Sequence, residues 1–184
     1  MKELTRVLIE FLKYFRHSCL AFDNTAETTK KFKQWIYRLE EKEMDNIDKR
    51  KIAIKIAWHY LGTPGKWGGD DFSGYDCSGF VIELLKSVGL LPSSGDWSAD
   101  GLMHLFWKKK VDKPYQGCLV FYGKSKATHV EMCINDELSI GASGVRSTTT
   151  SHAEAIKQNA YVKIRTINRR KDILVYLDPF KELK

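Results

Sequence analysis

Cys77 is the residue whose position in this sequence most clearly suggests covalent chemistry. A glycine-rich loop, W-G-G-D-D-F-S-G (67–74), leads into Y-D-C-S-G-F (75–80), and an apolar helical run follows. Asp76 is a suitable N-cap, which makes Cys77 the first residue of the predicted helix. Unpaired amides and the helix dipole favour negative charge there, so a thiol is biased toward the thiolate, the form that attacks carbonyl groups. This placement favours a nucleophile over a structural cysteine, which would more naturally lie inside the apolar face.

Glycines surround the cysteine in the sequence. Because glycine has no side chain, we predict that these residues keep the sulfur open to a substrate. The glycines in question are Gly68, Gly69, Gly74 and Gly79.

A nucleophilic cysteine needs a base, and a histidine is the usual one. His129 opens a strong predicted strand, H-V-E-M-C-I, directly after the turn-like segment G-K-S-K-A-T. A histidine at a strand start beside a helix N-terminus is the arrangement that cysteine peptidases use. A plain strand-end residue is the alternative. The other histidines, which lie on predicted helices or after a polar run, are His17, His59, His104 and His152.

The remaining cysteines are Cys19, Cys118 and Cys133, and no C-x-x-C pair occurs. A disulfide framework is typical of short, dense secreted scaffolds, so free thiols in a reducing compartment are expected. Zinc needs closely spaced ligand pairs, and only the isolated His17 and Cys19 come near that spacing. We therefore predict no metal and no cofactor.

The composition indicates a folded domain. The 184 residues are 43% hydrophobic and 12% aromatic, enough for one sizeable core. The net charge of +7 would suit nucleic acid, an anionic cell wall or a membrane surface, but no nucleic-acid motif accompanies it, and a solvated face is the simpler interpretation. Charges interrupt the apolar residues of 1–20, whereas a signal peptide or a span of roughly 20 residues needs an unbroken stretch. We therefore expect cytoplasmic synthesis without a secretory signal.

The hydrophobic periodicity changes along the chain. Steps of three and four residues predict helices over 4–15, 32–39, 52–60, 80–88 and 98–107. Alternating or short apolar runs then predict strands over 118–122, 129–134, 137–142, 161–165 and 173–177. Helices followed by strands indicate an α+β domain with helices packed on an antiparallel sheet. The first two helices would form a hairpin, so we predict an N-terminal helical extension over 1–46 and a second domain over 47–184.

Four segments in the order L-G-T-P-G-K-W-G-G (61–69), Y-D-C-S-G-F (75–80), G-C-L-V-F-Y (117–122) and T-H-V-E-M (128–132) resemble the NlpC family of cell-wall cysteine peptidases. The resemblance covers about residues 47–178. It implies a papain-like α+β fold and hydrolysis of amide bonds in peptidoglycan stem peptides, often after γ-D-glutamate. The substrate partner would then be the peptidoglycan stem peptide.

The resemblance also implies roles for single residues. Cys77 would be the nucleophile and His129 the base, while the backbone amide of Cys77 would help to hold the oxyanion. Asp76 and Ser78 match positions that contact the free amine of the stem peptide in similar enzymes. Trp67 would line the cleft, with packing in the core as its alternative.

Three positions depart from the family pattern. Gly65 replaces a tyrosine whose hydroxyl assists the oxyanion site, and Cys118 replaces an aspartate. The third polar residue, which orients the base, would fall at Gly141. Glu131 is two residues from His129 in a strand and points to the same face, so it could substitute, although an exposed strand glutamate is the simpler interpretation. A backbone carbonyl or a water could also hold the imidazole. On this basis hydrolysis should be slow, and Gly141→Asn should accelerate it if the backbone tolerates a side chain.

Two further functions stay open beside the hydrolase. One is a silent cell-wall-binding or structural module, favoured by Gly65 and Gly141; the other is a related thiol acyl hydrolase or transferase. Similarity to phage-borne and prophage-borne members suggests a phage particle or a non-classical route as the way to the cell wall. The helices of 1–46 would bind a virion or other protein partner, cover the cleft or pack as a structural extension.

Overall fold

The computed structural model describes residues 49–182, and these lie in one compact unit, Asp45–Lys184. The helical extension predicted for 1–46 lies outside the described residues and stays a prediction. Residues 49–59 are helical, in agreement with the apolar positions of this segment, and Ala53 and Ala57 are fully buried. Within the described range no helix is long and apolar enough to cross a membrane.

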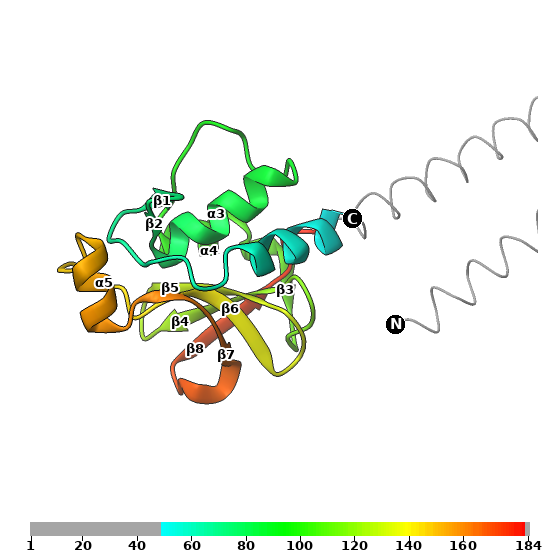
Figure 1. Cartoon of the computed structure of the whole chain (residues 1–184). Helices are drawn as coiled ribbons and strands as arrows, with labels where there is room; N and C mark the ends of the chain where they lie inside the picture. Colours follow the sequence, from blue (N-terminus) through cyan, green and yellow to red (C-terminus); the bar gives the residue numbers. More distant parts are fainter. Residues whose placement is uncertain (1–48, 183–184) are drawn as a thin grey trace, which may run out of the picture. The chain divides into compact units, whose positions relative to one another are not determined.

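An antiparallel six-stranded sheet forms the larger part of the domain (Figure 1). Its strand order is β3-β8-β4-β5-β6-β7, and every neighbouring pair runs antiparallel. The strands are β3 (Lys110–Val111), β4 (Leu119–Gly123), β5 (Ala127–Cys133), β6 (Leu138–Ser143), β7 (Tyr161–Thr166) and β8 (Ile173–Leu177). The α+β class with an antiparallel sheet, expected from the change of period, is confirmed.

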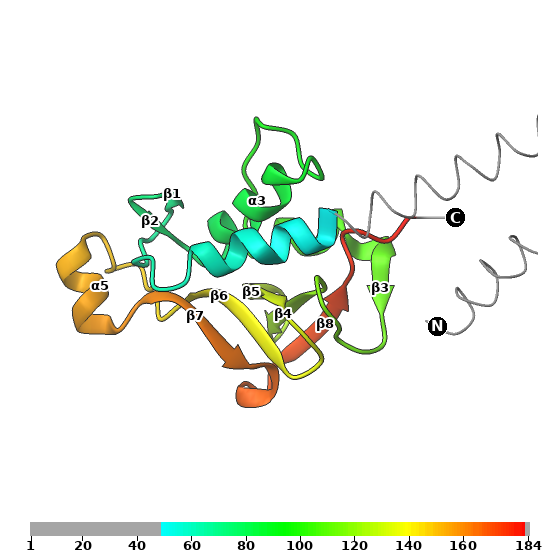
Figure 2. The same ribbon diagram turned by 45° about the vertical axis from the view of Figure 1, so that its right-hand side comes forward.

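Two helices cover one face of this sheet. α3 (Cys77–Ser87) contacts β5 and β6, and α4 (Ala99–Leu105) contacts β5. Figure 2 shows α3 and the 49–59 helix together above the strands. α3 buries most of its apolar side chains, among them Phe80, Leu84 and Leu85. Burying one such side chain stabilises a fold by about 1.5–3 kcal/mol. This packing therefore holds α3 in place against the sheet.

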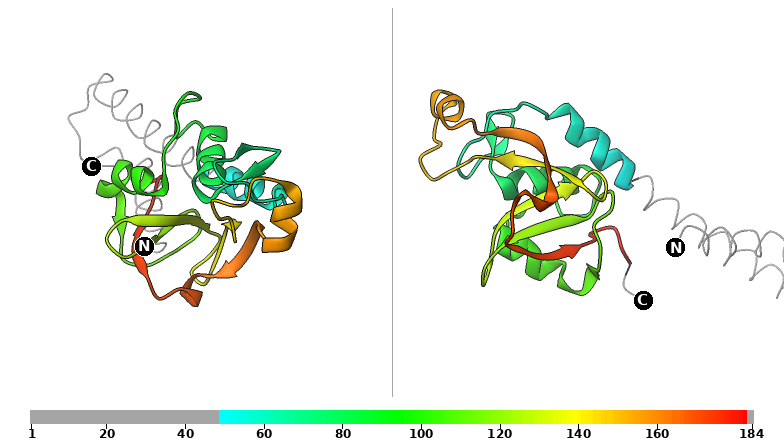
Figure 3. Two further views of the ribbon diagram at one scale, coloured as in Figure 1. Left: turned by 90° about the vertical axis from the view of Figure 1, so that its left-hand side faces the viewer. Right: turned by 90° about the horizontal axis from the view of Figure 1, so that it is seen from below.

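A second apolar cluster lies on the other face of the sheet. Its members come from β4, β5 and the segment after β7, and they are Cys118, Val120, Tyr122, Cys133 and Ile167. The 3-10 turn η2 (Ile167–Arg169) therefore packs on the side of the sheet away from the helices, as Figure 1 and the left view of Figure 3 show. With both faces covered, β4 is buried along its whole length, which explains its continuous apolar run.

Several short elements have no counterpart in the sequence-based prediction. β1 (Asp70–Asp71) and β2 (Gly74–Tyr75) form a two-stranded hairpin too short for any alternation to be visible. The 3-10 turn η1 (Trp107–Lys109) follows α4, which ends two residues earlier than predicted.

α5 (His152–Gln158) was also missed, because it buries only Ala155 and so has no apolar stripe. Its start did leave a signal in the sequence. Ser151 accepts a hydrogen bond from the backbone N–H of Glu154, the serine-to-glutamate spacing of a capping box.

Candidate active site

Cys77 is the first residue of α3, as the sequence predicted, and it is half-buried. Asp76 caps the helix, and its Oδ1 accepts hydrogen bonds from the backbone N–H of Gly79 (2.8 Å) and from the Ser78 hydroxyl (2.9 Å). The cap holds the first turn in one geometry, so the position of the sulfur is fixed by local contacts. Cys118 and Cys133 are buried in the second apolar cluster, and burial raises the pKa of Cys118 to about 12.

Two of the glycines around Cys77, Gly69 and Gly79, allow the backbone to pack closely, and the expectation that the glycines keep the sulfur open stays a prediction. A Cβ at Gly79 would lie 2.2 Å from the carbonyl oxygen of Gly69, and a Cβ at Gly69 would lie 2.2 Å from that of Gly74. The N–H of Asp76 also donates to the Gly69 carbonyl at 2.9 Å. The loop can therefore lie against the first turn of α3 only because these side chains are absent.

His129 lies on β5, opposite Tyr122 of β4. It is partly buried, whereas the other histidines that the structure describes, His59, His104 and His152, are exposed. Burial alone would lower the pKa of His129. Hydrogen bonds and charge from Cys77 and Glu131 outweigh that effect and raise the pKa to about 9. The cysteine and histidine selected from the sequence are thus brought together.

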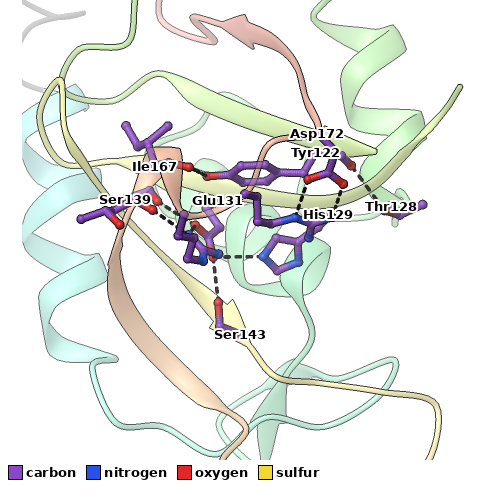
Figure 4. A network of polar contacts seen from close by, with 11 residues as sticks. Tyr122, Thr128, His129, Glu131, Ser139, Ser143, Ile167 and Asp172 are labelled. Atoms are coloured by element: carbon purple, nitrogen blue, oxygen red, sulfur yellow. Dashed lines mark hydrogen bonds and ion pairs between the residues drawn. The ribbon is translucent and has the colours of Figure 1, made fainter. Parts of the chain in front are cut away.

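Glu131 is fully buried, which corrects its interpretation as an exposed strand residue. Its Oε1 accepts a hydrogen bond from His129 Nε2 at 3.0 Å and another from the Ser143 hydroxyl at 2.8 Å. Oε2 accepts from the Ser139 hydroxyl at 2.7 Å. Figure 4 shows the carboxylate between the imidazole and these two β6 side chains. The side chain proposed as a substitute orienter is therefore in contact with the base.

Arg169 of η2 contacts the same carboxylate. Its Nη2 donates to Oε1 at 2.6 Å and its Nη1 to Oε2 at 3.0 Å. Burial alone would raise the pKa of Glu131, but hydrogen bonds and positive charge from His129 and Arg169 hold it well below its ordinary value. Sequence analysis missed Arg169, because it lies 38 residues from Glu131 and the contact joins η2 to β5.

Gly141 makes room for this arrangement. In the register of β5 and β6, Met132 pairs with Ile140 and Cys133 with Ser139, so Glu131 and Gly141 are opposite at the next position. A Cβ at Gly141 would lie 2.6 Å from Cγ of Glu131. The glycine therefore marks a space that Glu131 occupies from the neighbouring strand. The condition on which Gly141→Asn was expected to accelerate hydrolysis, that the position tolerates a side chain, is not met, since the new side chain would displace Glu131.

The hydrogen bond to Glu131 also determines which ring nitrogen of His129 faces the thiol. An ionised carboxylate only accepts hydrogen bonds, so Nε2 carries the proton. Nδ1 is then the nitrogen available to Cys77. A neutral His129 in this tautomer can take a proton from a thiol or a water through Nδ1, and its charged form can return one.

Gly65 occupies the position of the missing tyrosine, and the surroundings leave little room for a side chain. A Cβ there would lie 2.5 Å from Cγ2 of Val145 and 3.1 Å from Cβ of Ala160. Any hydroxyl contribution from this position is therefore absent, and the backbone amide at Cys77 stays the candidate oxyanion donor.

Trp67 is 58% exposed, so its alternative interpretation as a core residue is wrong. Its backbone N–H donates to the carbonyl oxygen of Thr149 at 2.8 Å, which ties the loop before β1 to the segment before α5. Asp76 and Ser78, the other predicted substrate contacts, flank Cys77 and are half-buried. Among residues 49–182, no cluster of three or more histidine, cysteine or acidic side chains could hold a metal ion.

Comparison with known proteins found related sequences and structures. The sequence model of the NlpC/P60 family matches residues 62–166. Over 107 residues the chain is 33% identical to the probable peptidoglycan endopeptidase LytE of Bacillus subtilis, a match that covers 54% of this chain and 30% of that protein. Over 91 residues it is 38% identical to the γ-D-glutamyl-L-lysine dipeptidyl-peptidase of Bacillus cereus, covering 45% and 25%. The chain thus matches less than a third of the length of either relative.

Solved structures show the same fold. An NlpC/P60 family protein from Bacillus cereus superimposes with a TM-score of 0.57 at 23% identity, covering 72% of this chain and 40% of that one. The peptidoglycan hydrolase RipB from Mycobacterium tuberculosis also gives a TM-score of 0.57, at 20% identity, covering 76% and 68%.

Proposed function

Since the chain belongs to the NlpC/P60 family, we propose that it is a cysteine-type peptidase that hydrolyses an amide bond in peptidoglycan stem peptides. The peptidoglycan substrate is supported by two relatives, one named a probable peptidoglycan endopeptidase and the other a γ-D-glutamyl-L-lysine dipeptidyl-peptidase. The cysteine-type mechanism follows from Cys77 and His129. Glu131 completes the set as the residue that orients the base.

One observation carries the proposal: His129 lies between a thiol at a helix N-terminus and a buried carboxylate. Nε2 is 3.0 Å from Glu131 Oε1, and Cys77 lies close enough to the imidazole to help raise its pKa. A nucleophile, a base and an orienting group in contact are what acyl transfer by a thiol requires.

The acylation step begins when the Cys77 thiolate attacks the amide carbonyl carbon. A C–S bond forms, and the carbonyl electron pair moves onto oxygen. The backbone N–H of Cys77, one of the unpaired amides at the start of α3, donates to that oxyanion. As the intermediate collapses the C–N bond breaks, and the His129 imidazolium gives its Nδ1 proton to the leaving amine. The products are a free amine and a thioester on Cys77.

Deacylation uses the same groups in reverse. Neutral His129 accepts a proton from water at Nδ1 while the water oxygen attacks the thioester carbonyl carbon. The C–S bond then breaks, and the carboxylic acid leaves. Glu131 keeps the imidazole in one orientation and tautomer through both steps and stabilises its charged form.

Substrate recognition is proposed at the start of α3. Asp76 and Ser78 flank the nucleophile, and an aspartate carboxylate suits the ammonium group of a stem peptide with a free amine. The exposed ring of Trp67, nine residues before Asp76, offers an apolar surface.

The alternative of a silent binding module rests on Gly65 and Gly141. Glu131 makes the contact that a side chain at position 141 would otherwise make, so only Gly65 still favours that alternative. Acyl transfer to another amine uses the same thioester, and the products distinguish it from hydrolysis.

The test is digestion of purified peptidoglycan and of one defined stem peptide in H₂¹⁸O, with fragments identified by mass spectrometry. We expect two fragments, with one ¹⁸O in the new carboxyl group. Cys77→Ala should abolish cleavage, and Cys118→Ala, which removes a thiol from the second apolar cluster, should preserve it. Cleavage by Cys77→Ala, or a folded parent that binds peptidoglycan without cutting it, would overturn the proposal. A product joined to an added amine would indicate a transferase instead.

A further inference from the structure

We infer that Arg169 is a positioning residue that keeps the Glu131 carboxylate ionised and aligned with His129 Nε2. The inference rests on the proposed function of this site, and it concerns a residue outside the nucleophile, base and orienter. Three features of the structure carry it: the geometry of the ion pair, the way Arg169 is itself held, and the charge that the mechanism requires.

The ion pair is bidentate. Each carboxylate oxygen of Glu131 receives one guanidinium nitrogen, at 2.6 and 3.0 Å. A planar guanidinium that binds both oxygens fixes the plane of the carboxylate as well as its distance. Since Oε1 also accepts from His129, the plane of the carboxylate sets the direction from which Nε2–H is held.

Arg169 is itself held by contacts with the end of β7 and with β4. Its Nη1 donates to the Thr166 carbonyl at 3.2 Å, and its guanidinium lies 5.5 Å from the centre of the buried Tyr122 ring. The Tyr122 hydroxyl donates to the Ile167 carbonyl at 3.2 Å, which ties η2 to the sheet (Figure 4). Tyr122 also pairs with His129 across the strands, with ring centres 5.8 Å apart. Arg169 and His129 therefore both lie against the Tyr122 side chain.

The charge of the base changes during the proposed reaction, and that of Arg169 does not. His129 is positive before acylation and neutral in the thioester. Without Arg169, Glu131 would then be a fully buried carboxylate with no positive partner in direct contact, a costly state. Protonation of Glu131 would remove this unpaired charge. The protonated carboxyl would then donate a hydrogen bond to Nε2, and the proton of neutral His129 would lie on Nδ1. That tautomer cannot take a proton from a thiol or a water through Nδ1.

Other titratable and charged groups surround the pair without replacing Arg169. Those acting on the Glu131 carboxylate or the His129 ring through charge are Cys77 of α3, Tyr122 of β4, Cys133 of β5, and Arg170 and Asp172 of the segment after η2. Arg170, the other cation, bonds both oxygens of Asp172, so its charge is already paired. Among residues 49–182, only Arg169 combines a permanent positive charge with direct bonds to Glu131.

The test compares the full-length parent with Arg169→Ala, Arg169→Lys and the matched control Arg170→Ala. On a defined stem peptide we expect Arg169→Ala to lower kcat by about 100-fold with KM unchanged, less than the ~10⁴-fold loss typical of removing an orienting carboxylate. Added guanidinium chloride at tens of millimolar should restore at least about tenfold of that loss, because Arg169 is partly exposed and its site can be refilled. Arg170→Ala leaves both bonds between Arg169 and Glu131 in place, so it should lose much less kcat than Arg169→Ala and show no response to guanidinium.

A second readout does not depend on activity. ¹⁵N NMR of the His129 ring reports which nitrogen carries the proton, and we expect the Nε2–H tautomer in the parent and Nδ1–H in Arg169→Ala above the pKa of the ring. If the parent fails to cleave the peptide, the proposed function falls and the tautomer still tests Arg169. A folded Arg169→Ala protein with parental kcat, or with reduced kcat but the parental tautomer and no rescue, would overturn the inference. Should Arg169→Ala not fold, Arg169→Lys carries the test: loss of the second donor should cost about tenfold in kcat, and a parental value would overturn it.

Discussion

The two sides of His129 are built in opposite ways. On the nucleophile side, Cys77 is fixed by its neighbours in sequence, through the Asp76 cap and backbone-to-backbone packing of glycines. On the orienting side, Glu131 is fixed by residues that lie 8 to 38 positions away, on β6 and η2. Cys77 is half-buried, whereas Glu131 is fully buried. Substrate has to reach the first, whereas the second has to exclude anything that would compete for the carboxylate.

The largest expected effect comes from breaking the orienting side. Glu131→Gln replaces the carboxylate by an amide that can donate to Nε2 and so favour the wrong tautomer, and we expect kcat to fall by about 10³–10⁴-fold. Arg169 would lose its partner, so unfolding free energy should fall by about 3–5 kcal/mol. Stem-peptide kinetics and denaturant unfolding measure both. Glu137→Gln, an exposed glutamate at the hairpin tip, is the matched control; equal behaviour of the two variants would contradict the orienting role.

Gly141→Asn breaks the same side from the neighbouring strand. The new Cβ would lie 2.6 Å from Glu131 Cγ, and overpacking of this kind costs about 1–3 kcal/mol of stability. Because Glu131 must move away from His129, we expect kcat to fall by about 100-fold, as for other losses of orientation. Thermal unfolding and turnover should be measured together on Gly141→Ala and Gly141→Asn. A faster Gly141→Asn enzyme would mean that position 141, and not Glu131, is the proper source of the orienter.

The pH dependence of kcat reports the pKa of His129, to which both Cys77 and Glu131 contribute. The pKa of His129 is raised to about 9, so the imidazolium that protonates the leaving amine should persist through neutral pH and be lost as pH rises through about 9. Above that value kcat should fall about tenfold per pH unit. NMR titration of His129 in Cys77→Ala and in Glu131→Gln should give a lower pKa in each, since each removes a partner of the charged form. If the His129 pKa is unchanged in one of these variants, the residue replaced there does not stabilise the imidazolium.

The smallest effect is expected on the open side. Trp67→Ala removes an exposed ring, so the unfolding free energy should stay within about 0.5 kcal/mol of the parent. If Trp67 contacts the stem peptide, KM should rise by about 5–10-fold with little change in kcat, because the contact is equal in ground state and transition state. Trp58→Ala, another exposed tryptophan, serves as the control. Equal KM values in the two variants would exclude Trp67 from recognition.

The same contrast explains what could be predicted from the sequence. The cap at Asp76, the helix that follows and the strand that begins near His129 depend on residues close in sequence, and the pattern predicted them correctly. The burial of Glu131 depends on how β5 pairs with β6 and on where η2 folds back. Alternation placed Glu131 on the same face as His129 but could not tell whether solvent or Arg169 lies above that face. The sequence pattern therefore selected Cys77 and His129, and it left open which residues hold the imidazole in place.

Glu131 and Gly141 also occupy a single volume between two strands. One carboxylate-sized side chain fits there, and it can be anchored on β5 or on β6, but not on both. We therefore expect the two positions to covary in related sequences, with a long polar residue on one strand accompanied by a small residue on the other. The double variant Glu131→Gly with Gly141→Glu should then be more active than either single variant. Related proteins would then all keep this space filled by one polar side chain, which could come from either β5 or β6.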